Sequence, residues 1–100
     1  MRFTWDETKN RSNLKKHGGI AFEEAAYVFS DPFRLTRQDR IEGGEERWQT
    51  IGVVYGVTVL LVAHTITEDD EDGQPVEVIR IISARRATSR ERKQYELETR

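Results

Sequence analysis

The chain has 100 residues, of which 34% are charged, and this size suits a single domain (residues 1–100) with one modest core. It has no cysteine, which excludes disulfides and thiolate metal sites and is typical of a reducing compartment such as the cytoplasm. The longest apolar run, residues 57–63 with Thr58 inside it, has the length of a strand. We therefore expect a cytoplasmic protein without a membrane segment.

The formal net charge is −2, but the charges are distributed unevenly along the chain. Residues 2–16 carry five basic and two acidic side chains, and residues 79–100 carry seven basic and three acidic ones. Residues 68–77 carry six acidic side chains and no basic one. If the two basic segments fold onto one side, the molecule has a basic face for an anionic partner despite its acidic total.

The first third of the chain predicts a short strand and two helices. Residues 3–5 form the strand, and Asp6 is a suitable N-cap for a helix that ends at Gly18-Gly19. Leu14 is the only strong apolar anchor of this helix. Residues 21–30 predict a second, amphipathic helix. Its stripe toward the core consists of Phe22, Ala25, Ala26 and Phe29.

The apolar period then changes from that of a helix to that of a strand. We expect strands at residues 34–39, 47–54, 57–66 and 76–84, a tight turn at 55–56, and loops at 42–45 and 68–75. Thr88 and Glu91 form a capping-box pattern that opens a C-terminal helix to about residue 98. The order β-α-α-β-β-β-β-α predicts an α+β fold with helices against an antiparallel sheet.

The last predicted strand ends in arginines, which is the most informative feature of the sequence. Ile79 and Ile81 belong on a buried surface, so Arg80 leaves the opposite face. Simple alternation places Arg85 on the face of Ile81, opposite to Arg80. A guanidinium on a sheet surface suits a phosphate, because its N–H donors form a planar fork. We predict Arg80 and Arg85 to be phosphate clamps; the alternative is a structural salt bridge with a carboxylate.

Four other side chains are candidates for acid–base or phosphate chemistry. Glu46 and Arg47 are neighbours on a strand and point to opposite faces, so one of them could be an ordinary surface residue. His64 ends an apolar strand and is either a general base or a hydrogen-bonded core residue. His17 is either a general acid or an ordinary helix C-cap, since the helix dipole favours its charged form.

Further basic side chains near these candidates could contact a nucleic-acid backbone without specificity. They are Lys16, Arg86, Arg90 and Lys93. The acidic run at 68–73 resembles a calcium loop only in part, because Glu68 stands where such a loop begins with aspartate and Ile79 where it needs a bidentate glutamate. We therefore expect a solvated loop there, and neither a metal nor another cofactor.

Residues spread in order over nearly the whole chain match one known family. They are Trp5-Asp6, Lys9, Asn13, Lys16-His17-Gly18, Phe22-Glu23-Glu24-Ala25, Val28-Phe29, Asp31-Pro32, Glu45-Glu46-Arg47, Ile51-Gly52, residues 80–88, Glu91 and Tyr95. On these residues the chain resembles the BrnT family of ribonuclease toxins, which have a RelE-like fold. The resemblance implies an endoribonuclease that inhibits translation and growth and is neutralised by a ribbon-helix-helix antitoxin similar to BrnA. DNA would be bound only through that antitoxin.

Cleavage of RNA without a metal needs a group that takes the proton of the ribose 2′-OH, and cations that neutralise the phosphorus oxygens. The candidate residues include both kinds of group, although none of their spacing is diagnostic by itself, and a metal-independent endoribonuclease is the activity that we predict together with the resemblance. Two other classes stay open. One is a catalytically inactive module of the same fold that binds RNA or the antitoxin, and the other is a structural partner protein whose arginines form buried salt bridges.

Overall fold

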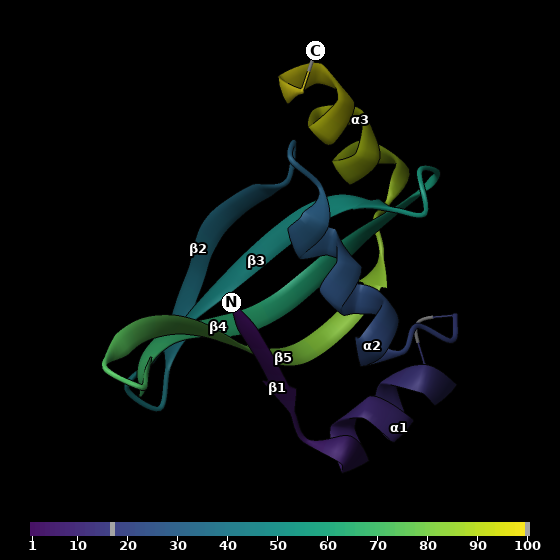
Figure 1. Cartoon of the computed structure of the whole chain (residues 1–100). Helices are drawn as coiled ribbons and strands as arrows, with labels where there is room; N and C mark the ends of the chain where they lie inside the picture. Colours follow the sequence, from purple (N-terminus) through teal and green to yellow (C-terminus); the bar gives the residue numbers. More distant parts are fainter. Residues whose placement is uncertain (17, 100) are drawn as a thin grey trace.

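The chain folds into one five-stranded sheet with helices packed against it (Figure 1). This computed structural model describes residues 1–16 and 18–99. The elements are β1 (Arg2–Trp5), α1 (Glu7–Lys15), α2 (Phe22–Ala25), the 3-10 helix η1 (Ala26–Ser30), β2 (Leu35–Glu42), β3 (Glu45–Val54), β4 (Thr58–Glu71), β5 (Gln74–Arg86) and α3 (Ser89–Glu98). The predicted α+β class and order of elements are confirmed.

The strands lie in the order β1-β5-β4-β3-β2. Strands β2 to β5 are antiparallel to their neighbours, as predicted. Strand β1 runs parallel to β5, with Phe3 opposite Ile79 and Trp5 opposite Ile81, so the expectation of a wholly antiparallel sheet is wrong. Local periodicity shows which residues of a strand are buried but carries no information about strand direction. The sheet is mixed because β1 and the last strand meet across almost the full length of the chain.

Buried amides anchor helix α1, in place of the predicted apolar anchor Leu14, which is exposed. Asn13 donates from Nδ2 to the backbone carbonyls of Ile20 (2.9 Å) and Ala84 (2.8 Å), and its Oδ1 accepts from the Ala84 N–H (3.2 Å). Asn10 accepts from the backbone N–H of Phe22 (2.9 Å). A mostly polar helix is therefore docked by hydrogen bonds to backbone groups that would otherwise be buried without a partner.

The helix ends follow the signals in the sequence. Asp6 caps α1, and Thr88 and Glu91 form both hydrogen bonds of a capping box at α3. The predicted helix at residues 21–30 is present as a short α-helix that tightens into a 3-10 helix. Among the residues that the structure describes, no helix has the length and apolar character needed to cross a membrane.

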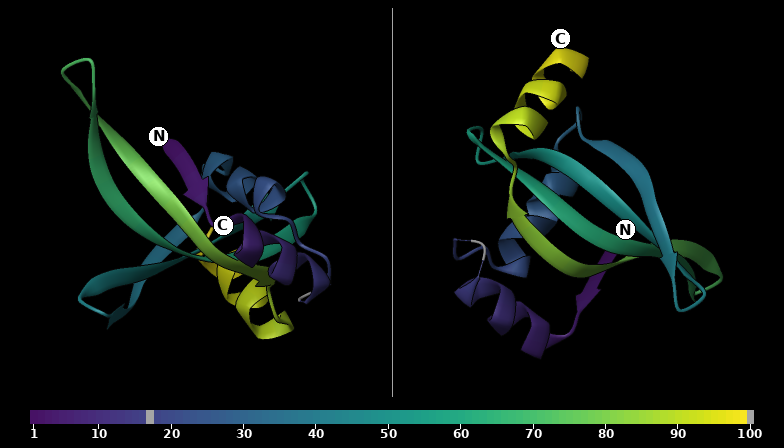
Figure 2. Two further views of the ribbon diagram at one scale, coloured as in Figure 1. Left: turned by 90° about the horizontal axis from the view of Figure 1, so that it is seen from below. Right: turned by 180° about the vertical axis from the view of Figure 1, so that it is seen from behind.

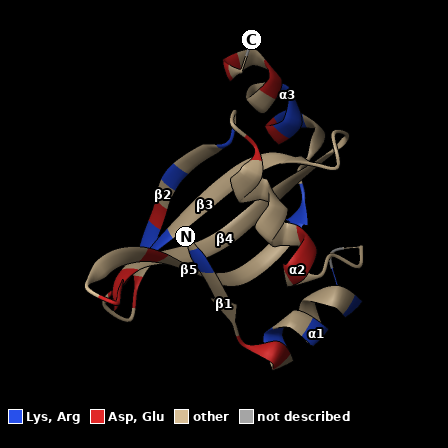
Figure 3. Ribbon diagram, in the orientation of Figure 1, with Lys and Arg blue, Asp and Glu red and all other residues tan. Residues whose placement is uncertain are grey.

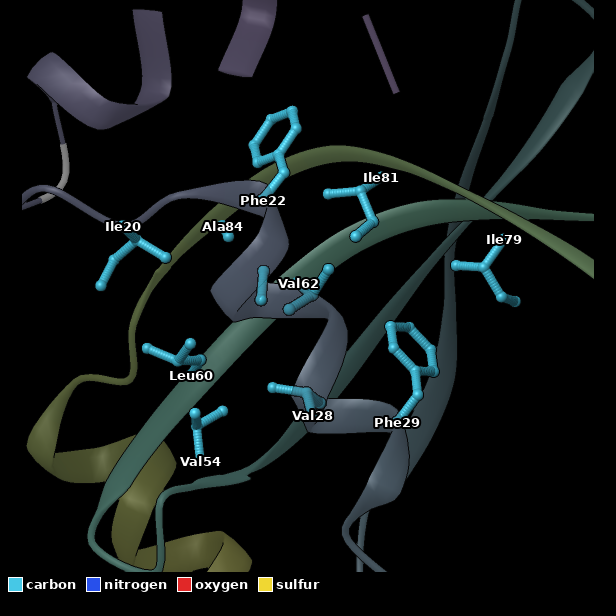
Figure 4. Close-up of a cluster of buried hydrophobic side chains, with 11 residues drawn as sticks. Ile20, Phe22, Val28, Phe29, Val54, Leu60, Val62, Ile79, Ile81 and Ala84 are labelled. Carbon is cyan, nitrogen blue, oxygen red and sulfur yellow. The ribbon is translucent and has the colours of Figure 1, made fainter. Parts of the chain in front are cut away.

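The core lies between the sheet and the pair α2–η1 (Figure 4). The predicted stripe is confirmed for Phe22, Ala25 and Phe29, which are buried, while Ala26 is half-buried. Side chains of β3, β4 and β5 meet this stripe from the sheet. They include Val54, Leu60, Val62, Ile79, Ile81 and Ala84. Helix α2 lies in front of the sheet in Figure 1 and behind it in the rear view of Figure 2, so α2 and η1 cover one sheet face, while α1 lies beside β5.

The segment 68–75, predicted as a loop, is the far end of a long β4–β5 hairpin that projects beyond the rest of the sheet (Figure 2). A tight turn at Asp72-Gly73 joins the strands, and both residues have positive φ (53° and 79°), as a turn that matches the strand twist requires. Arg2 of β1 pairs with Asp69 (2.7 Å) and Glu71 (2.5 Å). The acidic side chains can be accommodated in strands because they are exposed to solvent and because two of them pair with Arg2.

Candidate functional site

A bulge in β5 brings Arg80 and Arg85 to the same face of the sheet. Ala63 of β4 pairs with Ser83, but the next residue, His64, pairs with Ile81, so Ile82 is an extra residue on β5. Arg80 pairs with Thr65 and Arg85 pairs with Leu61. These two partners are four residues apart on β4 and therefore share a face. The expectation that the two arginines point to opposite faces is wrong, because it assumed unbroken alternation.

Three more arginines lie on this face, which α2 and η1 leave open, and one of them is Arg40, the partner of Arg47. Arg37 pairs with Gln49, which in turn pairs with Ala63 of β4. Ala63 lies two residues from Leu61 and two residues from Thr65, the partners of Arg85 and Arg80, so all of them share one face. Arg47 lies two residues before Gln49 on β3 and points the same way. We call this surface the arginine face. It is defined by Arg37, Arg47, Arg80 and Arg85.

The central contact of the arginine face is an ion pair between Arg80 and Glu45, with 2.6 Å between Nη2 and Oε1. The pair crosses over β4, because Arg80 belongs to β5 and Glu45 to β3. Both side chains remain accessible, at 45% and 36% of their full exposure. Glu45 was not among the candidate residues. Its position two residues before Arg47 in a strand was the available signal, since residues at that spacing share a face.

Of the two arginines Arg47 and Arg80, Arg47 is the more enclosed, with a side chain that is only 20% exposed. Its nearest carboxylate, that of Glu42, is 3.8 Å away. Within the described part of the chain, the Nε of Arg47 is buried and has no hydrogen-bond partner. A buried guanidinium N–H without an acceptor raises the free energy of the folded state, so binding of an anion beside Arg47 would be favourable.

Arg85 fixes helix α3 to the sheet. Its two terminal nitrogens donate to the two carboxylate oxygens of Glu91 at 2.7 and 2.9 Å. Glu91 also accepts from the backbone N–H of Thr88. The hydrogen bonds from Arg85 lower the pKa of Glu91 to about 2, against the opposing effect of burial. The structure therefore shows, for Arg85 as for Arg80, the salt bridge with a carboxylate that was the alternative to a phosphate clamp.

Glu46 and His64 lie away from the arginine face. Glu46 is exposed and, as the neighbour of Arg47, points to the other face. His64 is fully buried; its Nε2 is 2.7 Å from the hydroxyl of Thr50, and its ring lies edge-on to Phe29. Burial lowers the pKa of His64, so it is neutral in the core at pH 7. His17 lies outside the described residues.

The sequence matches, over residues 5–91, the family model described as "Ribonuclease toxin, BrnT, of type II toxin-antitoxin system". The chain belongs to the BrnT family. The fold is similar to that in the crystal structure of the Brucella abortus ribonuclease toxin BrnT, with a TM-score of 0.56 and 22% sequence identity over 89% of this chain and 99% of that one. At this identity the likeness shows the shared fold. Comparison with curated proteins gives no match.

Membership of the BrnT family makes the chain a ribonuclease toxin of a type II system, which implies an antitoxin as its partner. In this toxin acidic residues gather in the far part of the β4–β5 hairpin, while α1, β2 and α3 each carry both basic and acidic residues (Figure 3). Within the residues described, no three His, Cys, Asp or Glu side chains are arranged to hold a metal ion.

The four basic side chains predicted to contact the RNA backbone are not part of the arginine face, and Arg86 pairs with Leu60 on the core side of the sheet. Lys16 borders a shallow hollow between α1 and β5, where Ser83 is its neighbour. Arg86 donates to a backbone carbonyl of the segment after α1 at 3.1 Å. Arg90 lines a groove between α3 and the sheet, and Lys93 is exposed on α3 outside that groove.

Proposed function

We propose that this BrnT-family toxin is a metal-independent endoribonuclease whose site is the arginine face. The observation that carries the proposal is the meeting of Arg47, Arg80 and Glu45 on one open sheet surface, where the Arg80–Glu45 ion pair remains accessible to solvent. Two guanidinium groups beside one carboxylate combine the two functions that cleavage of RNA requires. These are neutralisation of phosphate charge and acceptance of a proton.

The arginines would bind the scissile phosphate. Arg47 offers a buried N–H that has no acceptor among the described residues, and Arg80 offers a fork that solvent reaches. As a phosphate enters, Arg80 exchanges the carboxylate of Glu45 for phosphate oxygens, which carry more charge as the reaction proceeds. Fixed cations in this position stabilise the transition state more than the ground state, and this difference is what accelerates the reaction.

Glu45, released from Arg80, is the proposed general base. Its carboxylate takes the proton of the ribose 2′-OH, the 2′ oxygen attacks the phosphorus, and the bond to the 5′ oxygen breaks. The leaving 5′ oxygen takes a proton from solvent, so the products are a 2′,3′-cyclic phosphate and a 5′-hydroxyl. Because His64 is enclosed in the core and Glu46 points to the other face, neither is part of the proposed site.

The test compares two adjacent glutamates that differ in the face they occupy. We expect Glu45→Gln to lower cleavage of a single-stranded RNA, in the presence of EDTA, by about 10²-fold or more, because a general base contributes roughly 10²–10⁴-fold. Glu46→Gln is the matched control and should cleave within a few-fold of the original. Cleavage that is lost in Glu46→Gln and kept in Glu45→Gln would place the site on the opposite face.

The arginine assignment is tested in the same assay by Arg80→Ala, with exposed Arg11→Ala of α1, which is not part of the arginine face, as the control. Arg80→Ala should abolish cleavage and the arrest of bacterial growth on induction, and Arg11→Ala should retain both. Retained cleavage in Arg80→Ala, with the protein folded, would refute the proposed phosphate clamp.

The proposed partner is a ribbon-helix-helix antitoxin similar to BrnA, which would neutralise the toxin by covering the arginine face and would carry all DNA contacts of the complex. The toxin would act in the cytoplasm, where messenger RNA is translated. The support for this proposal is the family, which implies an antitoxin, and the concentration of cationic side chains on one face. Arg80→Ala should still bind the antitoxin, because one substitution leaves most of that surface intact.

A further inference from the structure

A groove of about 580 Å³ lies between α3 and the open sheet face, at the end of the arginine face. The two regions are continuous. Arg37 belongs to the arginine face and lines the groove, and Glu91, the partner of Arg85, lines it as well. The volume is within the range of roughly 300–1,000 Å³ that is usual for small-molecule sites.

The lining of the groove has two chemical parts. Leu35, Ile51 and Leu61 present apolar side chains from β2, β3 and β4. The amides of Gln49 and Gln94 stand at the sides; Gln94 donates to Glu98 at 2.6 Å, and Gln49 accepts from Arg37 at 3.3 Å. A nucleobase has the same division, because its faces are apolar and its edges carry donors and acceptors. Amide side chains are able to supply both.

We propose that this groove is the subsite for one unpaired nucleobase of the RNA and that it selects the nucleotide near which the strand is cut. This inference rests on the proposed ribonuclease function. The base would lie on the apolar side chains of the sheet and exchange hydrogen bonds at its edge with Gln49 and Gln94. Its own phosphate, or the next one, would lie over the arginine face.

The positions of the arginines are compatible with one strand of RNA. The sheet partners of Arg80 and Arg85 are four residues apart on β4, which is about 13 Å at the usual rise of a strand. A short stretch of RNA would therefore span the distance between the scissile phosphate at Arg80 and the groove beside Arg85.

The groove is preformed, which favours recognition of a small flat group. Helix α3 is fixed to the sheet by the bidentate Arg85–Glu91 pair, by its capping box and by the hydroxyl of Tyr95, which donates to Asp31. Asp31 in turn accepts from the backbone N–H of Val53, at 2.8 Å. Walls that are held at both ends of the helix give the groove a fixed width, and a fixed width is what lets a site discriminate between bases.

The experiment measures which nucleotides flank the cut. Gln94→Leu and Gln49→Leu keep the size of the side chain and remove its hydrogen bonds, and Glu96→Gln on α3 outside the groove is the control. Each protein is incubated with a pool of random single-stranded RNA, and the ends of the products are sequenced. We expect the preference of the original at one position to fall about tenfold or more in the leucine variants and to be unchanged in Glu96→Gln. An unchanged preference in both leucine variants would overturn the inference.

A second measurement does not depend on cleavage and uses Arg80→Ala, the variant that we expect to be inactive. AMP, GMP, CMP and UMP are added in turn while the methyl NMR signals of Leu35, Ile51 and Leu61 are followed. At least one nucleotide should shift these signals, and Gln94→Leu, introduced into the same variant, should weaken the effect. If the original protein cuts no RNA but the methyl signals shift, the proposed function fails and the base site stands. If no nucleotide shifts them and groove substitutions weaken neutralisation by the antitoxin, the groove is a protein-docking surface and the inference is refuted.

Discussion

The salt bridge between Arg85 and Glu91 gives a quantitative test of how α3 is attached to the sheet. We expect Arg85→Ala to destabilise the toxin at pH 7 and to lose part of this effect in acid. The substitution removes both donors of a bidentate pair whose N···O distances are 2.7 and 2.9 Å. It leaves Glu91 at the N-terminus of α3, where the backbone of Thr88 still donates to it.

The magnitude follows from the pKa of Glu91, which is lowered from 4.5 to about 2. At 1.36 kcal/mol per pKa unit, the whole shift would correspond to about 3.4 kcal/mol of stability at neutral pH. Arg85 and Glu91 are 37% and 23% exposed, and solvent screening reduces the contribution of such a pair. We therefore expect a loss of about 1–2 kcal/mol, which lowers the Tm of a domain of this size by roughly 5–12 °C.

The dependence on pH has a definite sign. The folded state holds Glu91 ionised more strongly than the unfolded state does, so its stabilisation is complete above pH 4.5 and is lost as the pH falls toward 2. The difference in Tm between the original and Arg85→Ala should therefore narrow over this interval. Circular dichroism melts at pH 7, 5, 4 and 3 measure it, with Arg92→Ala on the outer side of α3 as the control. Equal melting temperatures at pH 7, or a gap that stays constant down to pH 3, would refute the assignment.

Three further predictions concern two buried polar residues, His64 and Asn13. His64→Ala should lower the free energy of unfolding by about 2–4 kcal/mol. The stability of the original should fall as the pH drops below 6.5, because His64 takes up a proton in the unfolded chain but resists it when buried in the fold. Urea unfolding at pH 7 and 5 tests both, with exposed Thr67→Ala as control; an unchanged midpoint would contradict them. Asn13→Ala should cost about 2–3 kcal/mol, since it leaves the N–H and carbonyl of Ala84 without their partner. Exposed Ser12→Ala should cost almost nothing, and equal urea midpoints for the two variants would show that the amide does not anchor α1.

The local structure of this toxin could be predicted where one short segment contains the whole signal. The cap of α1 at Asp6, the capping box of Thr88 and Glu91 and the core stripe of α2 each depend on residues within one or two helical turns. Alternation within one strand placed His64 on the face of Leu60 and Val62 but left open whether it is a general base or a core residue, and the structure shows it buried. The family could be identified from residues quoted in order, because that comparison needs no coordinates.

The site could be predicted only in part. Arg80 and Arg47 were named from the sequence, and both lie on the open face. The partner of Arg80 could not be named, because Glu45 is 35 residues away in the chain and reaches it across an intervening strand. The same limit applies to Asn13, whose hydrogen bonds to Ala84 join segments 71 residues apart.

The sequence by itself determined the order of the elements, the apolar surfaces and the presence of cationic side chains at the end of the last strand. Only the tertiary structure decided that Arg80 and Arg85 share a face, because a single extra residue, Ile82, reverses the alternation between them. It also decided that β1 joins the sheet in the parallel direction and that the acidic run is a hairpin. The physical reason is that strand register is set by pairing between distant segments, and one residue of register is enough to change which side chains meet.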